Sequence, residues 1–200
     1  MVRQATEIGV ATIQPILSQR TLLHPSAQKL DRWRRIAQEA AEQSERQIVP
    51  EVLPPLSWQE ALRSWNAAQA VCYLCEARGD YPHLLTCLMQ QVDRWQLAEH
   101  NNQESQTEHQ QTEHQQTEHQ DNLLPAAILV AVGAEGGWTS TEIEQALEAG
   151  YQPVALGSRI LRAVTAPLVA LSMIASVLES AQNQQDHEPE KIDKLKGKLS

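Results

Sequence analysis

The stretch from Ala127 to Pro167 reads AILVAVGAEGGWTSTEIEQALEAGYQPVALGSRILRAVTAP, and its pattern carries the strongest structural signal in the chain. Residues 127–132 form a continuous apolar run rich in β-branched side chains, which is typical of a buried strand. Gly133, Gly136 and Gly137 follow this run and allow a sharp turn and a close approach of the backbone to a ligand. The pattern therefore predicts a strand that ends in a glycine loop.

A helix and a second strand follow this loop. Thr139 and Glu142 have the spacing of a capping box at a helix start, and the second strand, over 153–156, ends at Gly157. In an open parallel sheet both loops lie at the carboxyl edge, where ligands bind. The sequence therefore predicts an α/β fold with a ligand site at that edge. Ordinary strand-to-helix turns remain an alternative, because neither a dinucleotide fingerprint nor a phosphate loop is present.

Apolar periodicity and turn residues predict the remaining elements. They are a helix that stops at Gly9, a strand over 11–17, a helix over 28–43, an extended segment over 49–55, a helix from Ser57 to about Asn66, a strand over 70–74, a helix over 81–96 and a helix over 165–181.

A polar low-complexity insert, 99–122, interrupts the predicted domain of residues 1–180. The pentapeptide QTEHQ occurs there three times in tandem, from Gln106, Gln111 and Gln116. The insert contains no apolar residue that would offset the entropy of ordering, so we expect it to be disordered, like the tail at 181–200. Its repeated histidines are five residues apart and do not align on one helix face, which favours a solvated linker over a metal site.

The net charge of −9 is unevenly distributed along the chain. Residues 1–97 carry ten Lys/Arg and ten Asp/Glu, whereas residues 98–122 carry six acids and no Lys or Arg. A local basic patch, rather than the net charge, would meet a phosphate backbone. Basic residues do cluster at Lys29, Arg32, Arg34 and Arg35, although a solvated helix face explains that cluster equally well.

The cysteines and the hydropathy pattern indicate a cytosolic protein. Cys72 and Cys75 form a lone CxxC, and since zinc needs four ligands, two buried thiols on a strand are the better interpretation and no metal is expected. No apolar run approaches the ~18 residues that span a membrane, and the N-terminus lacks the apolar core of a signal peptide.

Two motifs resemble those of the RsmE family. GAEGGW at 133–138 is similar to that family's G-P-E-G-G-F, and LGSRILRAVTA at 156–166 is similar to its L-G-P-R-I-L-R-T-E-T-A. RQATEIGV at 3–10 and EAAEQSER at 39–46 also resemble family segments. The family methylates uridine N3 in small-subunit (16S) ribosomal RNA with S-adenosylmethionine as cofactor. The resemblance implies a knotted SPOUT-type methyltransferase domain, with a mostly parallel sheet and flanking helices, that forms a homodimer.

The resemblance also implies site residues. We expect catalytic roles for Arg159, Arg162 and Glu135. The implied cofactor-binding residues are Leu74, Gly133, Ala134, Glu135, Gly136, Leu156, Gly157, Ile160, Leu161 and Arg162. The implied RNA-binding residues are Arg20, Glu42, Gln43, Ser44 and Arg46.

Several features depart from the family pattern. Ala163 and Val164 replace a Thr-Glu pair beside Arg162, and Glu45 replaces a glycine. The strand and the small PUA-like barrel that precede the 3–10 helix in the family do not precede it in this sequence, so we expect weakened RNA binding. The alternatives are a transfer-RNA methyltransferase of the same superfamily, or a truncated, non-catalytic RNA-binding or dimer-forming relic.

Overall fold

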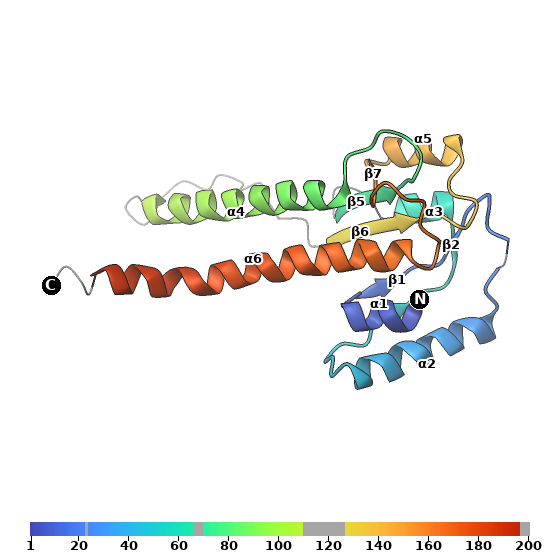
Figure 1. The fold of residues 1–200 in the computed structure, drawn as a ribbon, viewed down its shortest axis with the longest axis horizontal. Coiled ribbons are helices and arrows are strands. Elements are labelled where there is room, and N and C mark those ends of the chain that lie inside the picture. Colours follow the sequence, from blue (N-terminus) through green and yellow to red (C-terminus); the bar gives the residue numbers. More distant parts are fainter. Residues whose placement is uncertain (23, 66–69, 110–126, 197–200) are drawn as a thin grey trace. The chain divides into compact units, whose positions relative to one another are not determined.

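The structure, a computed structural model, describes residues 1–22, 24–65, 70–109 and 127–196. Its contacts divide the chain into two compact units, Met1–Leu84 with Pro125–Ser172, and Leu85–Leu124 with Met173–Ser200. All described strands belong to the first unit. Figure 1 shows the whole chain with the helices and strands labelled where there is room. The described residues of the second unit are α4 (Leu84–His109) without its first residue and the part of α6 (Ala166–Lys196) from Met173 onward.

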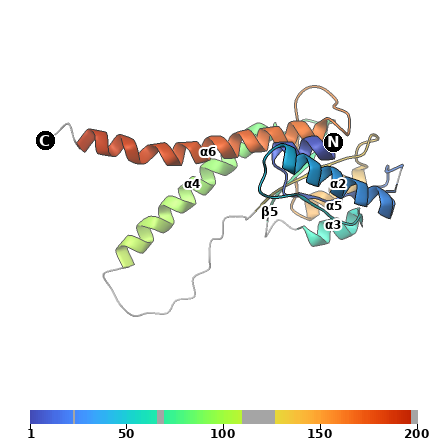
Figure 2. The same ribbon diagram turned by 90° about the horizontal axis from the view of Figure 1, so that it is seen from below.

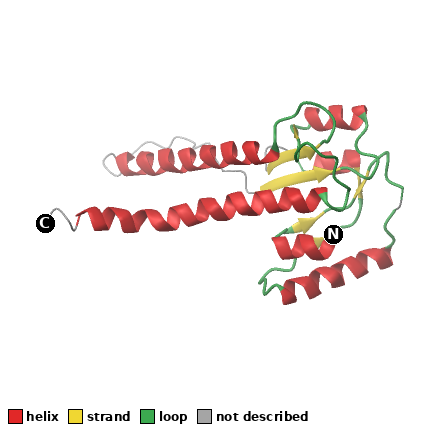
Figure 3. Cartoon of the chain, viewed as in Figure 1, coloured by secondary structure: helices red, strands yellow, loops and turns green. Residues whose placement is uncertain are grey.

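The central sheet of the first unit holds three parallel strands in the order β6-β5-β7 (Figure 3). Cys75 lies opposite Val132 on one side and opposite Val154 on the other, so the carboxyl ends of all three strands are level. This register confirms the predicted parallel sheet with glycine loops at one edge. The strands are β5 (Ala70–Cys75), β6 (Ala127–Val132) and β7 (Gln152–Val154).

Two short helices cover one face of this sheet. They are α3 (Trp58–Ser64) and α5 (Ser140–Glu148), which lie next to each other (Figure 2). Alternate residues of β5 point into the core beneath them, because successive side chains of a strand face opposite sides. That core contains Trp58, Ala70, Cys72, Leu74, Trp138, Ala146 and Tyr151.

The beginning of the chain forms a second layer of helices and very short strands. Val2, Ala37 and Val52 form its buried core. Two parallel pairs, β1 with β3 and β2 with β4, contain two residues in each strand. The elements are α1 (Val2–Ile8), β1 (Thr12–Ile13), β2 (Ile16–Leu17), α2 (Ala27–Gln43), β3 (Glu51–Val52) and β4 (Leu56–Ser57).

The single strand predicted over 11–17 is therefore wrong, because the structure has two. Pro15 separates β1 from β2, since proline has no backbone N–H for a strand ladder. The side chain of Gln14 donates hydrogen bonds to the carbonyl oxygens of Pro15 and Pro54 at this break. The chain consequently changes pairing partner from β3 to β4 within four residues.

Two long helices extend beyond their predicted ends. α4 continues to His109 and so includes the first histidine of the repeats, while the rest of the repeats lies outside the described residues. α6 continues to Lys196, through most of the predicted disordered tail. Apolar periodicity sets the predicted ends, but Gln, Glu, Lys and Ala favour helix without an apolar face. None of the described helices combines the length and apolarity needed to cross a membrane.

Three helices end in the same hydrogen-bond pattern. At the end of α2, the Arg46 N–H donates to Ala41 O at 2.9 Å and the Glu45 N–H donates to Glu42 O at 3.3 Å. This pair of bonds is a Schellman motif, whose central residue adopts the left-handed conformation. Gly9 after α1 and Gly150 after α5 hold the equivalent position, with φ of 118° and 84°. Glu45 has φ of 55° and is the only non-glycine residue with positive φ in the described part of the chain.

Replacing Glu45 with glycine is expected to stabilise the protein. A non-glycine residue in the left-handed region is strained, and glycine removes that strain. Glycine also raises the conformational entropy of the unfolded chain, which offsets part of the effect, so the net gain in the free energy of unfolding is about 1 kcal/mol. Urea denaturation measures the change. The control is Ser44→Gly, because Ser44 has φ of −94° and its hydroxyl donates to Ala40 O at 2.8 Å. Ser44→Gly should destabilise; equal effects of both glycines would contradict this account of the turn.

Candidate active site

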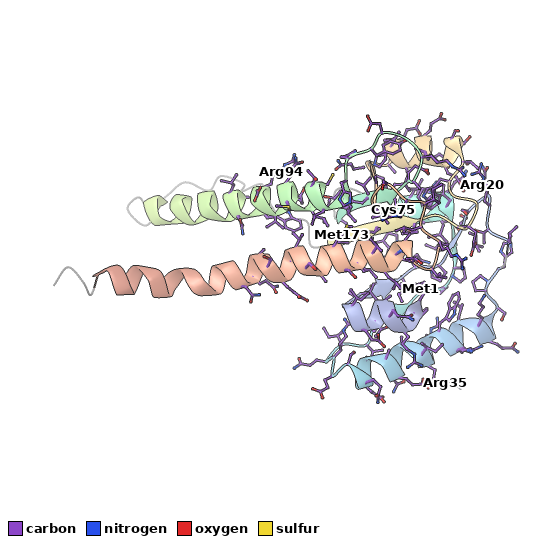
Figure 4. The ribbon with its side chains drawn as sticks, viewed as in Figure 1. Met1, Arg20, Arg35, Cys75, Arg94 and Met173 are labelled. Carbon is purple, nitrogen blue, oxygen red and sulfur yellow. The ribbon has the colours of Figure 1, made fainter. Side chains whose placement is uncertain are left out.

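A pocket of about 820 Å³ lies at the carboxyl edge of the central sheet, within the ~300–1,000 Å³ typical of small-molecule sites. It belongs entirely to the first unit. Loops after all three strands line it, at 76–78, 133–138 and 156–164. Arg20, from the loop between β2 and α2, also lines it, and both Arg20 and Cys75 are labelled in Figure 4.

Backbone forms much of the pocket wall after β6. The Gly137 N–H donates to Ala134 O at 2.8 Å, and Gly137 has a positive φ of 70°. A Cβ added to Gly133 would lie 3.2 Å from the carbonyl carbon of Gly137 and 3.3 Å from Cε2 of Trp138. A larger residue at 133 would have to displace these atoms, so glycine lets the loop fold back closely on itself. The result is a wall of peptide groups that can donate to and accept from a ligand.

Trp138 connects this loop to the sheet and to the core. Its indole Nε1–H donates to Cys75 O at 3.1 Å, at the end of β5. Its ring centroid lies 4.6 Å from that of Trp58, and the residue is 5% exposed. The tryptophan consequently fills core space and holds two edges of the pocket together.

The carboxylate of Glu142 is buried beneath the same loop and is 1% exposed. Oε2 accepts from the Thr139 N–H at 2.9 Å and from the Thr139 hydroxyl at 3.1 Å, which confirms the predicted capping box. Oε1 accepts from the Gln19 N–H at 2.8 Å. One side chain therefore caps α5 and anchors a loop that is 123 residues away in the sequence.

The pocket is rich in guanidinium groups. Arg78, Arg159 and Arg162 line it, and none of the three forms an ion pair within the described part of the chain. Two carboxylates accompany them: Glu76, which accepts from the Arg78 N–H at 2.8 Å, and Glu135. Unpaired arginines in a pocket suit an anionic or hydrogen-bond-accepting ligand.

Comparisons with known proteins agree with this geometry. The family model of an RNA methyltransferase domain matches residues 1–99 and 86–175. The chain belongs to the RsmE family of RNA methyltransferases. Ribosomal RNA small subunit methyltransferase E of Synechocystis is 42% identical over 180 residues, covering 90% of this chain and 49% of that protein. The Bacillus subtilis protein of the same name is 29% identical, covering 92% and 63%.

Solved structures have the same fold. Ribosomal RNA small subunit methyltransferase E from Neisseria gonorrhoeae, bound to S-adenosyl methionine, matches with a TM-score of 0.63 at 32% identity, covering 88% of this chain and 59% of that one. The likeness confirms the predicted α/β methyltransferase fold, while the knot stays a prediction. This chain spans 49% and 63% of the length of the Synechocystis and Bacillus subtilis ribosomal RNA small subunit methyltransferases E.

Most of the site residues that the RsmE resemblance implies meet at the pocket. All three residues expected to be catalytic line it, and so do all those expected to bind cofactor except Leu74. The side chain of Leu74 is 0% exposed and packs in the core under α3 and α5, because strand alternation turns it away from the pocket. The adjacent Cys75 lines the pocket instead.

Four of the five residues expected to bind RNA do not line the pocket; only Arg20 does. Arg46 closes the end of α1 instead: its Nη1 donates to Thr6 O at 2.6 Å and to Val10 O at 3.1 Å. Glu42 Oε1 accepts from the Gln38 amide at 3.2 Å. These residues of the RsmE motif at 39–46 therefore lie around the end of α2.

The loop after β5 was missed in the sequence. Glu76, Ala77 and Arg78 line the pocket, and the Glu76 N–H donates to Val154 O at 3.0 Å. The rule that places loops at the carboxyl edge was applied only to the strands before Gly133 and Gly157. Applied to the predicted strand over 70–74 as well, it would have found this loop.

The buried thiol of Cys75 leads to a prediction about the stability of the protein at alkaline pH. Burial raises the pKa of its thiol to about 12. In the unfolded chain the thiol ionises at about 8.5, so its stabilising contribution is complete below that pH and is lost as pH rises toward 12. The free energy of unfolding should fall by up to about 1.4 kcal/mol per pH unit above pH ~9 from this group. Urea denaturation between pH 8 and 10 tests this. Cys75→Ala should flatten the slope; an unchanged slope in that variant would contradict the assignment.

Proposed function

We propose that the pocket binds S-adenosylmethionine and that the protein methylates N3 of a uridine in 16S ribosomal RNA of the small subunit. One observation carries this proposal. The pocket lies at the carboxyl edge of a parallel sheet, both RsmE motifs line it, and close-packed glycine backbone forms one of its walls. The Neisseria gonorrhoeae relative with bound S-adenosyl methionine supports the choice of cofactor. Residues 1–180 are the proposed methyltransferase domain.

The residues around the pocket fit this cofactor. A Cβ at position 133 would enter the space next to Gly137. Because glycine has no Cβ, the peptide groups there stay accessible to the polar edges of adenine and ribose. Leu156, Ile160 and Leu161 supply apolar surface for the adenine ring on the opposite loop. The proposed cofactor-binding backbone therefore comes from 133–136 and 156–162. When bound, S-adenosylmethionine supplies an electrophilic methyl group on a sulfonium centre.

The protein side chains have to activate the uracil. N3 becomes nucleophilic only when its proton leaves, and charge then spreads onto the neighbouring carbonyl oxygens. Arg159 and Arg162 are the proposed groups that stabilise this anion, because both line the pocket without an ion-pair partner in the described residues. Glu135 is the proposed proton acceptor, as the carboxylate of the glycine loop. The loops at 133–138 and 156–164, which line the pocket, would hold the methyl group and the nitrogen in line.

The remaining parts of the proposal rest on the family resemblance. We propose that Glu42, Gln43, Ser44 and Arg46 form an RNA-contacting segment at the end of α2, and that the protein acts in the cytoplasm as a homodimer. A non-catalytic relic is the second candidate, favoured by one observation. Val164 lines the pocket with 55% exposure where the family has a glutamate, so a carboxylate is missing from that rim.

Calorimetric titration with S-adenosylmethionine is the first test of this function. We expect saturable binding, followed by methyl transfer to small ribosomal subunits but not to transfer RNA. Arg162→Met should lower kcat by about 10²-fold, as removal of a transition-state donor does elsewhere. Arg63→Met, on the exposed surface of α3, is the matched control and should leave kcat unchanged. A folded protein that fails to bind the cofactor contradicts the proposal, and binding without methyl transfer identifies the relic.

A further inference from the structure

We infer that Arg20 is a positioning residue that holds the glycine wall of the pocket in its binding-competent shape. This inference rests on the proposed function, because the wall matters through the cofactor that it receives. It differs from a direct RNA contact, the role that the family resemblance implies for Arg20. The segment Ser18–Thr21 and the loop 133–138 come from the two separate chain segments of the first unit and meet at this side chain.

The guanidinium group of Arg20 binds two carbonyl oxygens of the wall. Nη1 donates to Gly136 O at 2.6 Å and to Trp138 O at 2.9 Å, so both hydrogens of that nitrogen are used. A cationic donor makes stronger hydrogen bonds than a neutral one. The two bonds fix the orientation of the Gly136–Gly137 and Trp138–Thr139 peptide groups, which flank the turn at Gly137, where φ is 70°. They therefore restrain the most sharply turned part of the loop.

The stem of Arg20 lies against the glycine that its head group holds. A Cβ added to Gly136 would lie 2.9 Å from Cδ and 3.1 Å from Cβ of Arg20. A side chain at 136 could be accommodated only if the arginine moved, and the carbonyl bonds would then be lost. The conformations of Gly136, in the RsmE motif, and of Arg20 therefore depend on each other.

The backbone around Arg20 is itself fixed. Gln19 N–H is held at 2.8 Å by the buried carboxylate of Glu142, which also caps α5. Thr21 N–H donates to Ser18 O at 3.1 Å and closes a turn around the arginine. Arg20 consequently acts from a rigid base. Arg159 and Arg162, in contrast, form no side-chain hydrogen bond within the described ranges and remain available to substrate.

Variants of Arg20 separate positioning from RNA contact. Arg20→Met should weaken binding of S-adenosylmethionine about tenfold, because two charge-assisted bonds to the wall are lost. Arg20→Lys should restore part of that affinity, since one ammonium can replace the single nitrogen that makes both bonds. Binding of 16S ribosomal RNA without cofactor should change by less than about twofold. If Arg20 instead contacted an RNA phosphate, Arg20→Met would weaken RNA binding. It would also reduce the slope of log K against log salt concentration by about 1, and that result would overturn the inference.

A double-mutant cycle tests the contact between Arg20 and Gly136. Gly136→Ala should weaken cofactor binding in the native background but much less when position 20 is already alanine, because the obstructing stem is gone. Gly137→Ala is the matched control: its strain comes from φ of 70°, with no neighbouring atom within 4 Å of the added Cβ, so its effect should add to that of Arg20→Ala. Additive effects for Gly136 as well would overturn the inference.

Hydrogen exchange keeps this test independent of the proposed function. In Arg20→Met the amides of Gly137 and Thr139, which belong to the two peptide groups that Arg20 holds, should exchange at least about tenfold faster than in the native chain, whereas amides of α2 should be unchanged. If the native protein does not bind S-adenosylmethionine, the proposed function fails and exchange alone decides the role of Arg20. Unchanged exchange at the two amides, in a variant that melts like the native protein, would overturn that role.

Discussion

Glu142→Ala should lower the free energy of unfolding by about 3–5 kcal/mol. The carboxylate accepts hydrogen bonds from the N–H groups of Gln19 and Thr139 and from the Thr139 hydroxyl, and it is 1% exposed. Its removal leaves the partly buried N–H groups of Gln19 and Thr139 without their charged acceptor, and each such loss costs about 1–3 kcal/mol. Loss of the α5 cap adds to this. Urea denaturation of the two proteins at neutral pH measures the difference.

The chain contains a matched control for this experiment. α3 begins with a second capping box, in which the Glu60 carboxylate accepts from the Ser57 N–H at 2.9 Å, but Glu60 is exposed. Glu60→Ala removes the same local motif without breaking a long-range contact, so its effect should be much smaller. Similar losses from both variants would mean that Glu142 acts only as a cap and does not anchor the loop of Gln19.

Trp138→Ala is expected to cost about 3–5 kcal/mol and to abolish cofactor binding. Removal of a buried tryptophan leaves a large cavity beside Trp58, whose ring centroid lies 4.6 Å away. Trp138 also lines the pocket, and its indole Nε1–H donates to Cys75 O at 3.1 Å. The expected result is a lower urea midpoint together with undetectable binding of S-adenosylmethionine at 20 °C, where most of the variant is still folded.

Trp138→Phe isolates the hydrogen bond from the packing. Phenylalanine is the residue of the family motif at this position, but it cannot donate to Cys75 O, so we expect a loss of about 1 kcal/mol plus the smaller ring's packing loss. Trp33→Phe is the control, because Trp33 is half-buried on α2 and its indole makes no hydrogen bond within the described residues. Equal losses at both positions would show that the bond to Cys75 contributes nothing.

Local signals predicted many of the elements that carry the site. The apolar run at 127–132 is β6, and the capping box of Thr139 and Glu142 starts α5. Gly150 ends that helix in the left-handed conformation. Such signals lie within a few residues of one another, and the backbone preferences that they express do not depend on the rest of the fold. This is why the glycine loop and most of its lining residues could be located before any tertiary contact was known.

Other features depend on partners that are distant in sequence. The break between β1 and β2 reflects two different partner strands, and the position of the Leu74 side chain outside the pocket reflects which face of β5 meets α3 and α5. The loop at 76–78 joins the pocket only because β5 lies between β6 and β7. Strand order is not encoded in the alternation of any single strand, so periodicity could not supply it.

The sequence by itself determined the parallel α/β class, the RsmE motifs and two arginines of the pocket, Arg159 and Arg162, because these features lie in contiguous residues. Only the tertiary structure decided that Arg20 reaches Gly136 and that Glu142 reaches Gln19, across 116 and 123 residues. A carboxylate three residues after a threonine indicates a cap, but its second oxygen can serve any donor that folding brings near. Such long-range contacts form when the layers pack, and packing depends on the shape of the whole unit.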